Sequence, residues 1–380
     1  MLEEFDFQPL TRLVFGPGSL DRLGELARGL GAERVLVVSD RGVIDAGHTA
    51  RGIASLEAEG LDVVLYDGVE ENPTTRHVRE GVAVAREHRA DFFVGIGGGS
   101  SMDCAKGINF IYSAGGEIRD YWGVGKVPRP LHPMIAVPTT TGTGSEAQSF
   151  ALIADEETHQ KMACGDKKAA CKVAILDPLV TVSQPQHVTA ATGVDAIAHA
   201  VETFVTRKRN LLSRTFSLKA WKLLEANFER VLRAPDDLEA RAAMQVGATL
   251  AGYAIEHSML GAAHSAANPL TAHYGAVHGN AVGVMLPHVV LFNSQVSRDD
   301  YIELATVASG CRSPSVESLV DRLAELLEAS GLPTSLNHWE IEEARFPALA
   351  REAADQWTAQ FNPRPAVESD FEKLYRCASS

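Results

Sequence analysis

Cysteine is scarce in this chain of 380 residues, which has only five. They are Cys104, Cys164, Cys171, Cys311 and Cys377. An odd and sparse set is not typical of the disulfide framework of a secreted domain. The first residues, MLEEFDF, are acidic and lack the basic and apolar stretches of a secretory signal. We therefore expect a cytoplasmic protein.

Positive charge and long apolar runs are lacking as well. Lys and Arg number 35 against 49 Asp and Glu, so the formal net charge is -14, and basic residues form no block. Binding to nucleic acid or to an anionic membrane surface is therefore not expected. No run approaches the ~18 apolar residues that cross a bilayer. The expected partner is a small molecule.

The composition is that of a globular protein, with 45% hydrophobic and 22% charged residues. In the first half, short β-branched runs at 35–38, 63–66 and 92–96 are each closed by a turn signal, and two more end at 138 and 178. The stretch 75–89 between them has apolar residues at helical spacing. Continuously apolar strands alternating with helices predict a doubly wound parallel α/β domain over residues 1–185.

The second half has a different pattern of residues. β-rich runs stop near residue 186, and Ala/Leu-rich segments follow at 212–234, 237–255 and 316–330. This periodicity predicts an all-helical domain over residues 186–380. A chain of this length can form two such domains.

A glycine-rich loop, Gly97-Gly98-Gly99-Ser100, follows one expected strand and opens an expected helix. Residues without Cβ let backbone amides approach a phosphate, and the helix N-terminus adds its dipole. A tight turn that only needs glycine is the alternative, and we favour phosphate binding. The earlier Gly16-Pro17-Gly18 is not such a site, since Asp21 replaces the third glycine and no buried strand is expected before it.

Two further features accompany this loop. The segment 138–146, PTTTGTGSE, concentrates hydroxyl groups after a strand, where ligands bind in parallel sheets; alternatively, Glu146 completes a helix capping box. Asp40 closes the strand at 35–38 and either caps a turn or binds an adenosine ribose. In the second case its charge would repel a 2′-phosphate and favour NAD over NADP.

Asp195 and His199 are four residues apart, which places a carboxylate and an imidazole on one helical face. His264 and His278 lie farther along, each flanked by small residues. One Asp and three His make a mixed N/O site that suits Fe(II), Zn, Co or Ni. A surface hydrogen bond is the alternative for the pair at 195 and 199 taken alone.

Together these motifs resemble the iron-containing (group III) alcohol dehydrogenase family, which has the dehydroquinate synthase-like fold. The resemblance runs from about Thr11 to FNPRP at 361–365. It rests on GGGSSMDCAK at 97–106, PTTTGTGSE at 138–146, GVDAIAHAVE at 193–202 and the segment 261–283.

The resemblance implies an NAD-dependent enzyme that oxidises a small primary or secondary alcohol, or reduces the aldehyde, by hydride transfer to or from nicotinamide. It implies a homodimer or larger homo-oligomer. It also implies an alkoxide bound to the metal, which is iron in the family's usual form, with no side chain assigned as acid or base. The implied metal ligands are Asp195, His199, His264 and His278. The implied cofactor contacts are Asp40, Gly97, Gly98, Gly99, Ser100, Thr139, Thr140, Thr143 and Lys161.

One position departs from the family. Many members carry a histidine four residues after the third ligand, where this chain has Asn268. Asparagine cannot transfer a proton at neutral pH, so either water and the cofactor ribose carry the proton or His273 substitutes. Both residues are candidate positions of the substrate pocket.

Three alternative activities stay open. Two are a zinc-dependent polyol dehydrogenase like glycerol dehydrogenase and a reductase specific for a semialdehyde. The third, a lyase of the dehydroquinate synthase type, is disfavoured because segment 257–288 has no Lys or Arg to hold a polyanionic substrate.

Overall fold

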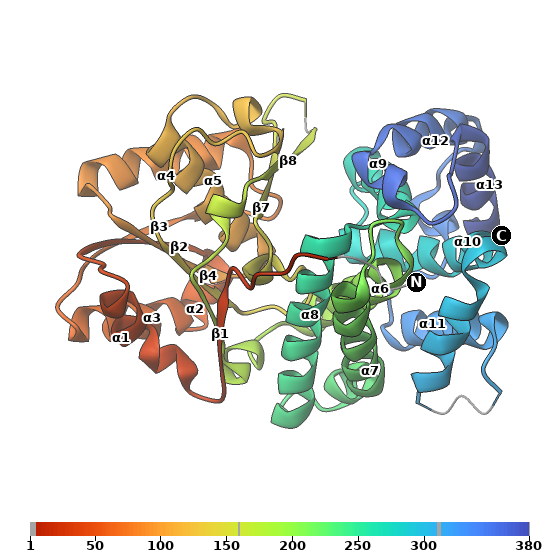
Figure 1. Cartoon of the computed structure of the whole chain (residues 1–380), viewed down its shortest axis with the longest axis horizontal. Helices are drawn as coiled ribbons and strands as arrows, with labels where there is room; N and C mark the ends of the chain where they lie inside the picture. Colours follow the sequence, from red (N-terminus) through yellow and green to blue (C-terminus); the bar gives the residue numbers. More distant parts are fainter. Residues whose placement is uncertain (1–4, 159, 310–312, 380) are drawn as a thin grey trace. The chain divides into compact units, whose positions relative to one another are not determined.

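A computed structural model describes residues 5–158, 160–309 and 313–379, coloured along the chain in Figure 1. Cys311 lies outside the described residues, as do the first four residues of the acidic N-terminus. The chain divides into two compact units. The α/β unit comprises residues 7–140 and 144–184, and the helical unit comprises residues 141–143 and the chain from 185 onward, with the extreme N-terminus.

A six-stranded sheet forms the centre of the α/β unit, and all its pairings are parallel. The strand order is β1-β9-β6-β4-β2-β3. The strands are β1 (Arg12–Phe15), β2 (Arg34–Asp40), β3 (Asp62–Val69), β4 (Phe92–Gly97), β6 (Met134–Pro138) and β9 (Val173–Leu176). The predicted parallel α/β class is confirmed.

Helices cover both faces of this sheet (Figure 1). They are α1 (Leu23–Gly29), α2 (Arg41–Asp45), α3 (His48–Ala58), α4 (Thr75–His88) and α5 (Gly99–Ala114). Short 3-10 turns are η1 (Ser19–Arg22), η2 (Ile118–Tyr121), η3 (Ser145–Ala147), η4 (Lys167–Ala169) and η5 (Pro178–Thr181). Val35 and Val37 pack into the core with α1 and α3, whereas Leu36 and Val38 pack into the core with α4 and α5. Both faces of β2 are thus buried, which explains its continuous apolar run.

The edge strand β1 is not predicted by the sequence. It precedes Gly16-Pro17-Gly18, so a strand does stand before that turn, although only Val14 in it is buried. Leu13 and Phe15 are exposed. Apolar residues lie on both faces of this strand although only one of them is buried. Its sequence therefore lacks the alternation of apolar and polar residues that indicates a strand.

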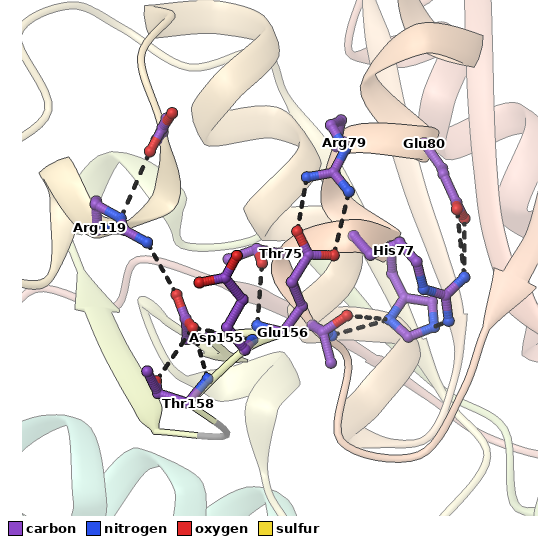
Figure 2. Close-up of polar contacts among 12 residues, drawn as sticks. Thr75, His77, Arg79, Glu80, Arg119, Asp155, Glu156 and Thr158 are labelled. Atoms are coloured by element: carbon purple, nitrogen blue, oxygen red, sulfur yellow. Dashed lines mark hydrogen bonds and ion pairs between the residues drawn. The ribbon is translucent and has the colours of Figure 1, made fainter.

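A small second sheet is also absent from the sequence-based expectation. It contains β5 (Gly123–Val124), β8 (Lys161–Gly165) and β7 (Phe150–Ala154) in that order, with β7 and β8 antiparallel. Figure 2 shows how the turn after β7 is held: Arg79 of α4 donates to both carboxylate oxygens of Glu156, at 3.0 and 3.1 Å. Arg119 donates to Asp155 at 3.0 Å.

The helical unit packs around a single apolar core. Its helices are α6 (Gln186–Val205), α7 (Leu211–Arg233), α8 (Leu238–Ser258), α9 (Ala262–Tyr274), α10 (His278–Val307), α11 (Val316–Ala329), α12 (Phe346–Asp355) and α13 (Glu368–Ala378). The 3-10 turns are η6 (Leu336–Trp339), η7 (Glu343–Arg345) and η8 (Trp357–Phe361). The expected helical C-terminal half is confirmed, and none of the helices described is both long and apolar enough to span a membrane.

Candidate functional site

The buried helix α6 brings two of the expected ligands together. Asp195 and His199 are each 5% exposed, and Asp195 Oδ1 lies 3.5 Å from His199 Nε2. His264, from the first turn of α9, places its Nε2 3.4 Å from the same oxygen. The rings of His199 and His264 stack with their centroids 4.8 Å apart. One ligand atom from each of the three residues lies within 4.8 Å of the other two.

His278 joins this group from the first residue of α10. Its Nε2 lies 3.9 Å from Asp195 Oδ1, and its side chain is 29% exposed. The next residue explains the close approach of α10 to α6, because a Cβ at Gly279 would lie 2.0 Å from the carbonyl oxygen of Ala191. The Nε2 atoms of His199, His264 and His278 therefore all lie within 3.9 Å of Asp195 Oδ1.

The polar atoms of this cluster are suited to a cation. Asp195 Oδ1 and His264 Nε2 are buried and have no hydrogen-bond partner. Leaving such atoms unsatisfied costs about 1–3 kcal/mol each. A divalent first-row metal ion would satisfy both, and one carboxylate with imidazole nitrogens is a donor set such ions accept. The residues present thus fit the metal that the family resemblance implies.

Burial and the neighbouring charges shift the pKa values of this cluster in opposite directions. Burial lowers the pKa of His199 to about 4, despite the attraction of Asp195. Burial also acts to lower the pKa of His264, but Glu202 and Asp195 outweigh it and raise that pKa to about 9. The nearby histidines hold the pKa of Asp195 below its ordinary value in spite of burial. The carboxylate is therefore ionised and available as a ligand.

Glu202 is a member of this site that the sequence reasoning missed. It is 3% exposed, and its Oε2 lies 2.5 Å from His264 Nδ1. Its spacing in the sequence could have indicated it. Glu202 follows Asp195 by seven residues, which is about two helical turns, so both side chains lie on the same face of the helix. A carboxylate behind a histidine ligand commonly orients the ring.

Asp40, Gly97 and the start of the loop 138–146 lie at the carboxyl edge of the six-stranded sheet. β2 ends at Asp40, β4 ends at Gly97, and β6 ends at Pro138. The Thr139 amide donates to the Gly97 carbonyl at 2.9 Å, which joins the two loops. Strand order reverses between β2 and β4, because the chain runs from β2 outward to β3 and then returns to β4. Ligands of open parallel sheets bind at this kind of reversal.

Asp40 already makes two contacts at this edge. One carboxylate oxygen accepts from the Val43 amide at 3.1 Å and caps α2, and the other accepts from the Ser101 hydroxyl at 2.8 Å. The capping alternative is therefore observed. The contact with Ser101 also ties the end of β2 to the first turn of α5.

The glycines leave little free space around the loop itself. A Cβ at Gly97 would lie 2.4 Å from Ser101 Oγ, and one at Gly98 would lie 3.1 Å from Thr140 Cγ2. Gly99 and Ser100 begin α5, and the Ser100 hydroxyl accepts from the Asn72 amide at 3.3 Å. The glycines thus serve close packing at the helix N-terminus.

The hydroxyl-rich loop divides between the two units. Thr139 and Thr140 belong to the α/β unit, whereas Thr143 belongs to the helical unit. Gly142 lies against α6, since a Cβ there would be 2.5 Å from Thr192 Cβ. The loop leads into the short turn η3 and then β7 rather than an α-helix, so the capping-box alternative for Glu146 is wrong. Lys161 is the half-buried first residue of β8.

The two candidate pocket positions on α9 differ in exposure, since Asn268 is half-buried and His273 is exposed. Asn268 is one turn after His264, and its amide donates to Gln356 Oε1 at 3.0 Å. His273 is exposed, and its Nε2 lies 2.7 Å from Glu352 Oε2. Nine residues separate His273 from His264, which corresponds to opposite faces of a helix. The geometry favours Asn268 as the position near the metal cluster.

Comparison with known proteins agrees with this arrangement. The family model "Iron-containing alcohol dehydrogenase" matches residues 10–178, and "Fe-containing alcohol dehydrogenase family, C-terminal" matches residues 189–379. The chain belongs to the iron-containing alcohol dehydrogenase family. It is therefore an oxidoreductase that acts on alcohols, as an alcohol dehydrogenase or aldehyde reductase.

Similar proteins have been named for different substrates. The chain is 32% identical to a 1,3-propanediol dehydrogenase of Citrobacter freundii, over 98% of both chains. It is also 32% identical to an NAD-dependent methanol dehydrogenase of Bacillus methanolicus, over 96% of this chain and 97% of the relative. The solved structure of sulfoacetaldehyde reductase from Bifidobacterium kashiwanohense in complex with NAD+ is similar, with a TM-score of 0.91 and 25% identity, over 100% of this chain and 99% of that one.

Proposed function

We propose that this protein is an NAD-dependent alcohol dehydrogenase, or aldehyde reductase, that uses iron or another divalent metal ion. The observation that carries the proposal is the buried cluster in which Asp195 Oδ1 lies 3.5 Å from His199 Nε2 and 3.4 Å from His264 Nε2. A cluster that leaves a carboxylate oxygen and an imidazole nitrogen without hydrogen bonds is costly unless a cation occupies it.

The metal ligands in this proposal are Asp195, His199, His264 and His278. When bound, a divalent ion supplies Lewis-acid chemistry to the oxygen of the alcohol or aldehyde. α6 holds two of the ligands rigidly, because they project from adjacent turns of a helix that is buried along most of its length. With a metal ion bound at Nε2, the Nδ1–H of His264 would donate to the Glu202 carboxylate, which would orient the ring.

The cofactor would bind at the carboxyl edge of the sheet. The N-terminus of α5, with Gly97, Gly98, Gly99 and Ser100, offers backbone N–H groups to the pyrophosphate. Asp40 would accept hydrogen bonds from the adenosine ribose, which favours NAD over NADP. Thr139, Thr140, Thr143 and Lys161 would lie along the rest of the cofactor. Two similar proteins support this choice: the methanol dehydrogenase is named as NAD-dependent, and the sulfoacetaldehyde reductase was solved in complex with NAD+.

The substrate in this proposal is a small primary or secondary alcohol, or the corresponding aldehyde. Relatives of equal identity are named for 1,3-propanediol and for methanol, so the substrate of this chain must be read from its own pocket. Asn268 can orient a substrate oxygen by hydrogen bonding but cannot take up its proton. The proton would therefore leave by water and the cofactor ribose.

We also propose that the protein forms a homodimer or larger homo-oligomer. β1 pairs with β9 on one side only and exposes Leu13 and Phe15. An exposed edge strand with apolar side chains favours association with another chain. Multi-angle light scattering of the protein, and of Leu13→Lys, tests this; a monomeric wild type contradicts it. The buried and free Cys104, Cys164 and Cys171 support a place in the cytoplasm.

The proposed function is tested by following NADH absorbance with protein loaded anaerobically with Fe(II). Ethanol, 1,2-propanediol and 1,4-butanediol are offered with NAD or NADP, with and without chelator. We expect NAD reduction that chelator and His264→Ala abolish. Full activity of His264→Ala with no bound metal would contradict the proposal.

A further inference from the structure

The carboxylate of Glu202 contacts α9 at two points. Its Oε2 lies 2.5 Å from His264 Nδ1, and its Oε1 accepts from the backbone amide of Ala263 at 2.7 Å. One side chain therefore fixes both the ring of His264 and the turn of backbone that carries it. Asp195, His199 and Glu202 occupy positions i, i+4 and i+7 of α6, so the same helix face presents ligands and support.

The N-terminus of α9 receives a second contact from far along the chain. Asn362 Oδ1 accepts from the backbone amide of Ala262 at 3.2 Å. A helix leaves its first four N–H groups without helical partners, and Gly261, which precedes α9, has no side chain to cap them. Asn362 and Glu202 thus serve two consecutive amides, those of Ala262 and Ala263.

Asn362 is itself held in one orientation. Its amide donates to Asn293 Oδ1 at 2.7 Å and to the carbonyl of Arg364 at 2.6 Å, and its Oδ1 accepts from Asn293 Nδ2 at 3.0 Å. Asn362 and Asn293 are each 1% exposed. The Arg364 guanidinium donates to the carbonyl of Phe292 and lies 3.8 Å from the centre of its ring. The FNPRP segment is therefore anchored to α10 while it caps α9.

Gly261 leaves no room for a side chain between the turn that precedes α9 and the oxygens of Asn362 and Glu202. A Cβ at this position would lie 2.9 Å from Asn362 Oδ1 and 3.1 Å from Glu202 Oε1. Any side chain would push both oxygens away from the amides they accept from. The three residues together form one bracket around the start of α9.

We propose that Glu202 and Asn362 are positioning residues that hold His264 with its Nε2 toward Asp195. This inference rests on the proposed function, in which His264 is a metal ligand. It also assigns a task to the FNPRP motif, which lies far from the metal ligands in the sequence. Neither residue is a ligand itself; each acts through the first turn of α9.

The test measures the affinity of the full-length protein for Co²⁺ by competition with a chelator, together with the visible absorption of the bound ion. Glu202→Gln has one acceptor oxygen and cannot serve both the Ala263 amide and the His264 ring. Since the loss of a partner behind a ligand commonly weakens metal binding by 10–100-fold, we expect a loss of about that size and an altered Co²⁺ spectrum. Glu202→Asp keeps the charge and should retain more affinity than Glu202→Gln.

Glu225→Gln is the matched control. Glu225 is another buried carboxylate of the helical unit, and it accepts from Ser309 and from Arg322 at 2.8 Å. This substitution should lower the melting temperature and leave the Co²⁺ affinity unchanged.

The role of Asn362 is tested by comparing Asn362→Ala with Asn362→Asp. Only the second variant retains an acceptor for the Ala262 amide. Asn362→Asp should bind Co²⁺ more tightly than Asn362→Ala.

The outcomes separate the two proposals. If His264→Ala loses Co²⁺ while Glu202→Gln binds it like the wild type, the positioning role is wrong and the metal site stands. If Glu202→Gln and Glu225→Gln weaken binding equally, the effect is a general loss of stability and the positioning role is again wrong. If His264→Ala binds Co²⁺ as tightly as the wild type, the metal site itself is wrong.

Discussion

Lys106 donates hydrogen bonds from its buried ammonium group to both the hydroxyl and the carbonyl oxygen of Ser145, at 2.8 and 2.7 Å. The carbonyl oxygens of Gln148 and Phe150 also lie within hydrogen-bond distance of this nitrogen, at 2.9 Å each, so its three N–H groups are shared among four acceptors. The lysine of the glycine-rich motif therefore points into the α/β unit, where it fastens the end of the hydroxyl-rich loop to α5.

Replacing this lysine should destabilise the protein. Lys106→Met leaves the carboxylate of Asp103, 3.9 Å away, without its buried cation and strips three backbone carbonyls of a donor. Removal of one member of a buried ion pair costs about 3–5 kcal/mol, which denaturant unfolding can measure. Lys373→Met, at a side chain 74% exposed, is the control and should change stability by less than about 0.5 kcal/mol. Equal effects of the two would show that the buried network contributes nothing.

Asp40→Asn should change cofactor preference. Asparagine can still cap α2, but it no longer places a negative charge at the end of β2. Like charges brought together cost several kcal/mol, so we expect the ratio of kcat/KM for NAD over NADP to fall by at least about tenfold. Asp45→Asn, in the exposed ion pair with Arg41 in the same short helix, should leave the ratio unchanged. An unchanged ratio in Asp40→Asn would remove Asp40 from the ribose site.

Gly279→Ala should disturb the metal cluster. The added Cβ would lie 2.0 Å from the Ala191 carbonyl oxygen, so α10 must shift away from α6 and carry His278 with it. We expect a loss of about 1–3 kcal/mol of stability and weaker Co²⁺ binding. Gly283→Ala, which meets Val194 one turn later on α10, should lower stability while affecting Co²⁺ binding less. Metal affinity that falls equally in both variants would argue against a specific displacement of His278.

Acid should loosen the turn that follows β7 (Figure 2). Hydrogen bonds from the backbone amides of Thr158 and Glu157 lower the pKa of Asp155 from its ordinary 3.8, so the folded form favours the carboxylate. A depressed pKa stabilises the fold at pH values above the unfolded pKa, and this contribution is lost as the pH falls through the folded pKa. Hydrogen exchange of residues 154–158, corrected for intrinsic rates, should therefore accelerate below about pH 4. In Asp155→Asn the exchange should be faster at neutral pH and lack this acid step.

The sequence predicts the elements whose burial is complete and misses those whose burial is partial. β2 and β4 are covered on both faces, so their apolar runs are continuous and easily recognised. β1 exposes Leu13 and Phe15, and the pair β7 and β8 belongs to a small sheet beside the main one. Neither shows the alternation that marks a strand with one buried face.

The candidate site divides in a similar way. Asp195 and His199 can be paired from their spacing, because both lie on one helix. Nothing in the spacing of His264 and His278 places them beside that pair, and they are associated with it by family resemblance. Asn362 contacts α9 only because the chain folds back on itself, so no local pattern could indicate its position.

The decapeptide from Gly193 to Glu202 supplies two expected ligands and the carboxylate that supports a third. Each residue of a helix turns the chain by about 100°. A single insertion or deletion between Asp195 and Glu202 would therefore rotate one group off the shared face, whatever residue was added. Changes of length must therefore be confined to other parts of the chain.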